Sequence, residues 1–213
     1  MIKGVIFDLD GVLVSTDIIH YECWKYITDK NGIHFDENVN SSIKGMSRMG
    51  CLDYILKYNN IDLSIEEKEK LCDEKNNKYI ERLNKMSSKD VSHDLLKILD
   101  YLKHNGYKLA VASPSKNCKL ILEKLGLIKY FEVICDGYSV ERFKPDPEVF
   151  LKAQSLLGLN IDECIIVEDA LNGIDAAYSG GFKSIGIKDA SFYNKTTFKI
   201  KSLIEIIDIV KNI

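Results

Sequence analysis

Short apolar segments that each end in a polar residue recur along this chain, and no other feature limits its fold as strongly. The segments span residues 2–7, 107–112, 131–135 and 164–167. Patterns with helical spacing lie at about 93–105, 116–125, 147–157 and 171–180, and glycines at 106, 126 and 158 are placed to end helices. Such alternation predicts an α/β domain with a mainly parallel sheet.

Residues 15–87 interrupt this alternation. They carry helical periodicity and no convincing strand, so they predict an all-α insertion. We therefore expect an α/β core domain of residues 1–14 and 88–213, and a helical cap domain of residues 15–87. The polar edges of the insertion could act as pivots. A last amphipathic helix is expected within residues 202–213.

Charge and composition exclude several classes of partner. The 213-residue chain is 46% hydrophobic and 29% charged, as in ordinary folded domains. Its net charge of -3 gives no bulk attraction to nucleic acid or to anionic membranes. The first residues do not resemble a signal peptide, and no segment approaches the roughly 20 apolar residues of a membrane span. Six cysteines without a C-x-x-C pair suit buried thiols, and we expect a cytoplasmic protein.

Acidic residues follow two of the expected strands. Asp8 and Asp10 stand two apart where the first strand ends, so their side chains leave on the same side. Because such carboxylates repel each other, they indicate a cation between them or protonation of one during turnover. A lone pair of this kind is more often a turn or a helix cap. Glu168 and Asp169 add oxygen ligands at another strand end, where parallel sheets bind ligands, and an all-oxygen site suits Mg²⁺.

The other strand ends carry groups suited to phosphate. Ser113 ends the second expected strand, and residues 115–117 (Ser115, Lys116 and Asn117) are expected to open the next helix. A hydroxyl, helix N-terminal amides and a cation together can cradle a phosphate. Lys144 lies in a loop with two prolines. A lone loop lysine is usually solvated, but a place between a strand end and the helix at 147 favours a functional role.

Taken together, these motifs resemble those of the haloacid dehalogenase (HAD) superfamily. The matching residues are 8–12 (Asp-Leu-Asp-Gly-Val), Ser113, Lys144-Pro145 and Glu168-Asp169, in the order of the superfamily's four motifs. The resemblance covers nearly the whole chain. It implies a HAD-like Rossmannoid core with a parallel sheet, a small all-α cap inserted after the first strand, and Mg²⁺-dependent phosphoryl transfer.

Within this superfamily, further positions resemble the β-phosphoglucomutases. These are Thr16, His20, Trp24, Lys44, Gly45, Met46, Ser47, Arg48, Lys75, Asn76, Ser113, Pro114, Ser115, Lys116 and Asn117. Those enzymes interconvert β-glucose 1-phosphate and glucose 6-phosphate through β-glucose 1,6-bisphosphate. The resemblance thus implies an intramolecular phosphotransferase, an isomerase, that binds a sugar phosphate. It also implies Mg²⁺ as cofactor, glucose 1,6-bisphosphate as activator and intermediate, and a monomer.

The resemblance also assigns roles in the core. Asp8 would attack phosphorus and form an acyl phosphate. Asp10 would protonate the leaving sugar oxygen and deprotonate the incoming one. The expected metal ligands are Asp8, Asp10 through its backbone carbonyl, Asp169 and, near or in the ligand shell, Glu168. Lys144 and Ser113 would add donors to the moving phosphoryl group.

In the cap, the resemblance implies one group of residues that binds the second phosphate and another that controls when Asp10 can act. Arg48 would bind the phosphate that is not transferred, together with residues 115–117, so that substrate binding drives closure. His20 and Lys75 would transmit this closure to Asp10, which Thr16 would hold until then. Each residue also has a plain alternative, since lone histidines are commonly packing or surface residues and lone charges are commonly solvated.

Some positions depart from the mutase pattern, and other functions stay open. Cys51 stands where serine is usual, Pro114 replaces a small residue, and residues 92–94 lack the usual Pro-Gly. We still expect Cys51 and Pro114 to line the substrate site. A sugar-phosphate phosphatase would use the same chemistry and end in hydrolysis. A non-catalytic phospho-sugar sensor is the third alternative, and the intact acidic motifs count against it.

Overall fold

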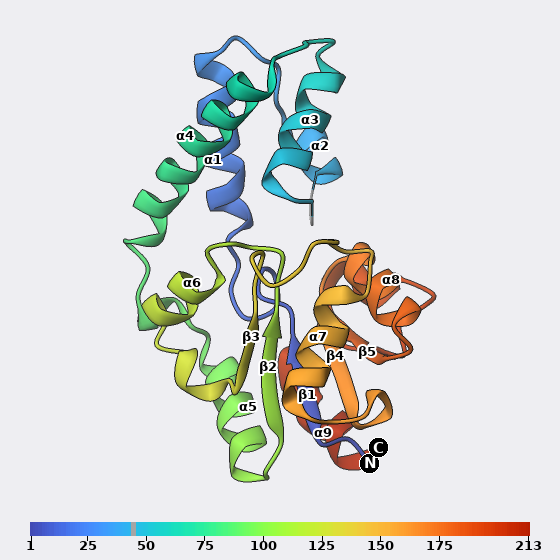
Figure 1. The fold of residues 1–213 in the computed structure, drawn as a ribbon. Coiled ribbons are helices and arrows are strands. Elements are labelled where there is room, and N and C mark those ends of the chain that lie inside the picture. The colour runs from blue at the N-terminus through green and yellow to red at the C-terminus, as the bar shows by residue number, and fades with distance from the viewer. Residues whose placement is uncertain (44–45) are drawn as a thin grey trace. The chain divides into compact units, whose positions relative to one another are not determined.

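The computed structural model describes residues 1–43 and 46–213, and its backbone divides into two compact units. We call residues Met1–Ser15 with Met86–Ile213 the α/β unit, and residues Thr16–Lys85 the helical unit. Figure 1 shows the ribbon of both. Lys44 and Gly45, two of the expected substrate-binding residues, lie outside the described residues.

A parallel sheet forms the centre of the α/β unit. Its strands are β1 (Gly4–Phe7), β2 (Lys108–Ala112), β3 (Val133–Cys135), β4 (Cys164–Glu168), β5 (Lys183–Gly186) and β6 (Phe198–Lys199). Across the described sheet they lie in the order β3-β2-β1-β4-β5-β6, and each neighbouring pair is parallel. Phe7 is in register with Val111 and with Val167, so the carboxyl ends of the three central strands are level. The expected α/β class with a parallel sheet is confirmed.

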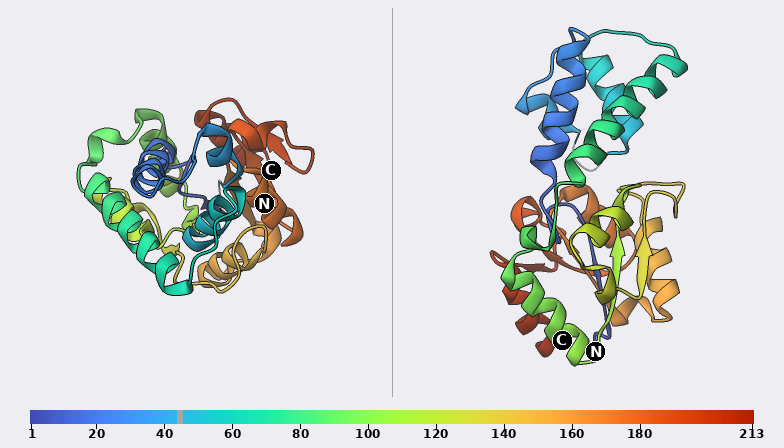
Figure 2. Two further views of the ribbon diagram at one scale, coloured as in Figure 1. Left: turned by 90° about the horizontal axis from the view of Figure 1, so that it is seen from above. Right: turned by 90° about the vertical axis from the view of Figure 1, so that its left-hand side faces the viewer.

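Helices cover both faces of this sheet. They are α5 (His93–His104), α6 (Cys118–Lys124), α7 (Glu148–Leu157), α8 (Leu171–Ser179) and α9 (Ile206–Asn212). The right-hand view of Figure 2 shows α7 on one side of the sheet and the paired helices α5 and α9 on the other. The right-handed crossovers that are the rule between parallel strands predict this arrangement, because the chain moves outward to β3 and then returns past β1 to β4.

The helical unit consists of α1 (Asp17–Lys30), α2 (Glu37–Ser42), α3 (Arg48–Tyr58) and α4 (Ile65–Leu83). Side-chain caps begin three of these helices: Asp36 accepts from the Val39 amide, Ser47 from Gly50, and Ser64 from Glu67 in a capping box. Buried apolar side chains from α1, α2, α3 and α4, and from the loop after α1, form the unit's core. Across the described part of the chain, no helix has the length and apolar character needed to cross a membrane.

Candidate active site

Asp8 occupies the carboxyl end of β1, at the level of the end of β4. Its amide donates a hydrogen bond to the Val167 carbonyl over 2.9 Å, and its side chain is buried. The chain then turns tightly, since the Gly11 amide donates to the Val14 carbonyl over 2.6 Å. Asp10 lies within this turn and is half-buried. The turn therefore directs both acidic residues to the sheet edge where α/β folds bind ligands.

Glu168, the last residue of β4, is held by the backbone that follows it. Its Oε2 atom accepts hydrogen bonds from the amides of Asp169 and Ala170, at 2.7 and 3.1 Å. A Cβ atom at position 173 of α8 would lie 1.7 Å from Glu168 Oε1, so Gly173 leaves the space for this carboxylate. The Glu168 side chain is thus fixed in orientation before any ligand binds.

Lys144 joins the ends of β1 and β4 through a buried pair of ionic contacts. Its Nζ atom lies 2.5 Å from Asp8 Oδ1 and 2.7 Å from Glu168 Oε1, and all three side chains are less than 10% exposed. Burial raises the pKa of Asp8, Lys144 opposes this, and the neighbouring carboxylates Glu168 and Asp169 raise the pKa further. Burial lowers the pKa of Lys144, but its two carboxylate partners outweigh this effect and raise it. Lys144 is therefore the buried cation that offsets part of the acidic cluster's charge.

The acidic residues are arranged in a way that suits a hard divalent cation. Asp8, Glu168 and Asp169 each offer an oxygen atom, and these atoms all lie within 4.8 Å of one another. The Asp169 carboxylate lies directly over Gly11, where a Cβ atom would come within 1.8 Å of Oδ2. An all-oxygen donor set of this kind fits Mg²⁺. The side chain of Asp10 is not in this group, so Asp10 would contribute only through its backbone.

The end of β2 carries a turn built on serine hydroxyls. Ser113 is fully buried, and its Oγ atom accepts from the Ser115 amide at 3.1 Å, while Ser115 Oγ accepts from the Asn117 amide at 3.3 Å. Helix α6 begins only at Cys118, so Ser115 and its neighbours precede the helix, with Asn117 at the N-cap. Lys116 Nζ lies 5.1 Å from the centre of the Tyr138 ring. These hydroxyls and amides are grouped at the same sheet edge as Asp8.

In the helical unit, Lys75 is a buried cation on α4. Its Nζ atom lies 2.8 Å from His20 Nδ1, 5.4 Å from the Trp24 ring centre and 4.6 Å from the Tyr79 ring centre. Burial, followed by the charges of Lys75 and Arg48, holds the pKa of His20 well below its usual range. His20 is therefore neutral near pH 7 and accepts a hydrogen bond from the Lys75 ammonium.

Of the remaining predicted cap residues, all but Thr16 lie around the start of α3. Arg48 donates to Asn76 Oδ1 over 2.6 Å, which links α3 to α4. Met46 is exposed, whereas Cys51 is buried, its thiol directed at the Ile43 carbonyl 3.5 Å away. Burial raises the pKa of the Cys51 thiol to about 12. Thr16, also buried, is the first residue of the unit.

Sequence reasoning missed two residues beside the predicted groups. Tyr79 follows Lys75 by four positions on α4, and this helical spacing could have identified it. Lys188 Nζ lies 3.5 Å from Asp169 Oδ2. Lys188 follows β5, a strand that was not expected because its four residues include Lys183, Ser184 and Gly186. Recognition of that strand would have placed Lys188 at the candidate site.

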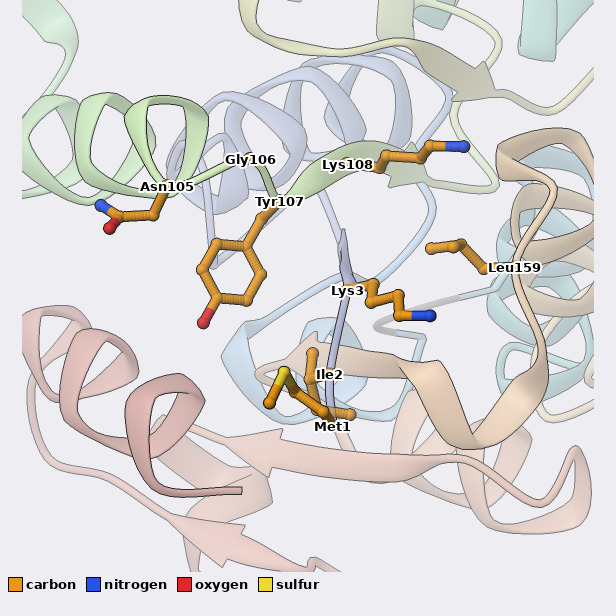
Figure 3. Close-up of a pocket in the computed structure, with 8 residues that line it drawn as sticks. All are labelled: Met1, Ile2, Lys3, Asn105, Gly106, Tyr107, Lys108 and Leu159. Atoms are coloured by element: carbon orange, nitrogen blue, oxygen red, sulfur yellow. The ribbon is translucent and has the colours of Figure 1, made fainter.

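A separate pocket lies at the opposite edge of the sheet, at the amino ends of β1 and β2 (Figure 3). Lys3 and Lys108 contribute to its wall, but both ammonium groups have partners. Lys3 pairs with Glu163 at 2.5 Å, and Lys108 donates to the Leu157 carbonyl at 2.7 Å. This pocket is therefore distinct from the acidic site.

Comparison with known proteins identifies the family to which this fold and its acidic site belong. A family model described as haloacid dehalogenase-like hydrolase matches residues 5–187, and the chain belongs to this family. The chain is similar to a β-phosphoglucomutase of Bacillus subtilis, with 35% identity covering 87% of this chain and 83% of the relative. It is also similar to a phosphorylated carbohydrates phosphatase of Thermotoga maritima, with 29% identity covering 86% of this chain and 83% of the relative.

A solved structure extends this similarity to three dimensions. The crystal structure of a β-phosphoglucomutase from Clostridium difficile matches with a TM-score of 0.93 and 36% sequence identity, covering 99% of this chain and 96% of that one. The expected HAD resemblance, and its narrower likeness to β-phosphoglucomutases, are confirmed. The chain is thus an enzyme of the HAD family.

Proposed function

We propose that this protein is a Mg²⁺-dependent β-phosphoglucomutase that interconverts β-glucose 1-phosphate and glucose 6-phosphate through β-glucose 1,6-bisphosphate. The observation that carries this proposal is the contact of buried Lys75 with half-buried, neutral His20, at two positions where the sequence resembles mutases. The similarity of 35 to 36% to two β-phosphoglucomutases, over most of the chain, supports it.

In this proposal Asp8 is the nucleophile. Its carboxylate attacks the phosphorus of a sugar phosphate, the sugar oxygen leaves, and an aspartyl phosphate forms. Lys144 keeps an ammonium group at Asp8 Oδ1 and so favours the ionised, nucleophilic form. Buried Ser113 supplies a hydroxyl at the same sheet edge to orient the phosphoryl group.

Asp10 is the proposed general acid and base. It donates a proton to the sugar oxygen that leaves and removes one from the oxygen that attacks next. Asp8, Asp169 and the Asp10 backbone carbonyl would hold Mg²⁺, with Glu168 beside them. Mg²⁺ would offset negative charge on the transferring phosphoryl group.

The helical-unit residues are proposed to select sugar over water as the acceptor. Arg48 would bind the phosphate that is not transferred, together with Ser115, Lys116 and Asn117. A guanidinium suits this role because it donates two parallel hydrogen bonds to phosphate oxygens. Arg48 already donates to Asn76, which holds it in a defined position before phosphate binds.

A sugar-phosphate phosphatase is the second candidate. The similarity to a carbohydrate phosphatase of Thermotoga maritima favours it, since that relative is matched over a similar share of both chains. The two candidates share Asp8 and Asp10 and differ in what accepts the phosphoryl group.

Activation by bisphosphate tests the proposal. Formation of glucose 6-phosphate from β-glucose 1-phosphate and Mg²⁺ should show a lag that a trace of β-glucose 1,6-bisphosphate removes, because the bisphosphate phosphorylates Asp8. Asp8→Asn should abolish this activation. A steady reaction that ignores the bisphosphate and yields glucose would contradict the mutase assignment and support the phosphatase.

A further inference from the structure

Lys188 is a cation held beside a proposed metal ligand, and it is the first residue of the 3₁₀ helix Lys188–Phe192 that follows β5. Its Nζ atom lies 3.5 Å from Asp169 Oδ2, and its side chain is 45% exposed, against 17% for Asp169. The backbone also links this segment to Asp169. The amide of Ala190, two residues after Lys188, donates to the Asp169 carbonyl over 3.0 Å. The lysine therefore reaches the acidic site from its solvent side.

The backbone at Lys188 is unusual for this residue type. Its φ angle is +54°, in the left-handed region that glycine and asparagine tolerate better than lysine. Local strain of this kind persists where surrounding structure imposes it, and it occurs often at functional sites. Here the imposed conformation accompanies a side chain that contacts Asp169 Oδ2.

We propose that Lys188 is a tethered counter-cation that competes with Mg²⁺ for Asp169 and so sets the affinity of the metal site. The inference rests on the Mg²⁺ site in the proposed function. Lys144 offsets the charge of Asp8 and Glu168 from the buried side, whereas Lys188 acts on Asp169 from the exposed side. Lys188 is thus a positioning residue for the metal ligand.

The sign of the effect follows from electrostatics. An ammonium at Asp169 repels an incoming divalent cation and must give up part of its contact when the metal binds. Because Lys188 is nearly half exposed, solvent weakens this repulsion and salt screens it. Removing the charge should tighten Mg²⁺ binding about 3- to 10-fold at low ionic strength, and less at high ionic strength.

The test measures the dissociation constant of MgCl₂ by isothermal titration calorimetry, without substrate. Lys188→Met removes the charge but keeps a side chain of similar length, and it keeps the same backbone strain because both are L residues. Lys188→Arg keeps the charge. Lys195→Met is the matched control, because Lys195 is similarly exposed at 41% and pairs with Asp175, which is not among the grouped acidic residues.

The proposal predicts tighter binding for K188M alone, with K188R and K195M close to the wild type and the gain reduced in high salt. Equal binding by the wild type and K188M would overturn this inference while leaving the Mg²⁺ site intact. The same gain in K195M would also overturn it, because it would reveal a general effect of net charge. No Mg²⁺ binding by any of the four proteins would overturn both the inference and the proposed metal site.

Discussion

Lys75 Nζ lies 2.8 Å from His20 Nδ1 and close to the rings of Trp24 and Tyr79, and the His20 ring also packs against Tyr79, with ring centres 4.3 Å apart. A buried ammonium is costly unless neighbouring groups compensate it. The His20 lone pair and the faces of the two rings supply that compensation. The helical unit therefore maintains a charge in its interior that a simple packing role would not require.

The lowered pKa of His20 predicts how stability depends on pH. Folded His20 stays neutral below the usual histidine pKa of about 6.5, whereas the unfolded chain binds a proton there. The unfolded state then binds more protons, so the free energy of unfolding should fall as the pH falls, by up to about 1.4 kcal/mol per pH unit. Urea denaturation at pH 7.5 and 5.5 should show a smaller drop for His20→Asn than for the wild type. An equal fall in the free energy of unfolding for both proteins would contradict the lowered pKa of His20.

Replacing Lys75 should separate catalysis from stability. Lys75→Met puts an apolar side chain of similar length among the same rings, and it removes the cost of burying an ammonium group. We expect the mutase kcat to fall about 100-fold through misplacement of His20, with little change in Tm. Lys78→Met, on the exposed face of the same helix, is the control and should keep wild-type activity. A wild-type kcat for K75M would remove Lys75 from the mechanism.

Lys144 should be essential for the stability of the acidic cluster. Lys144→Met leaves Asp8 and Glu168 buried without their cation, which should lower the free energy of unfolding by about 3–5 kcal/mol at neutral pH. The pKa of Asp8, already raised by burial, should rise further in this variant. A raised folded pKa stabilises at low pH and loses that contribution as pH increases, so K144M should be least stable above neutral pH.

Denaturation of K144M beside a control variant tests this prediction. Lys152→Met removes an exposed lysine of α7 that donates to the Ser139 carbonyl, and it should leave stability nearly unchanged. A K144M protein as stable as K152M at pH 8 would show that Lys144 does not offset the buried carboxylates.

Gly11 should be required for the position of Asp169. An alanine Cβ there would lie 1.8 Å from Asp169 Oδ2, and its φ angle of +88° is also unfavourable for alanine. Gly106 is the matched control, with φ at +78° and no atom within 4 Å of the built Cβ. We expect Gly106→Ala to cost about 1 kcal/mol of stability, and Gly11→Ala to cost more and to weaken Mg²⁺ binding. Equal effects of the two substitutions on Mg²⁺ affinity, measured by calorimetry, would contradict this geometry.

The sequence predicted the central strands and the all-α insertion, but it missed the elements with the weakest apolar pattern. Strands β1, β2 and β4 were expected because central parallel strands are continuous apolar runs. β6, with only two residues, carries no such signal, and α2 was missed because Val39 is its only apolar residue. At the site, motif residues at strand ends could be expected to meet, but the ionic contacts of Lys144 depend on side-chain packing that spacing does not encode.

The fate of the phosphoryl group tests the mutase assignment most directly. Phosphorus NMR can follow β-glucose 1-phosphate in the presence of the protein, Mg²⁺ and a trace of β-glucose 1,6-bisphosphate, and it resolves both possible products in one sample. The account predicts that the signal moves to glucose 6-phosphate, with orthophosphate a minor product. Orthophosphate as the main product from the start of the reaction would contradict it, and would show that water accepts the phosphoryl group from Asp8.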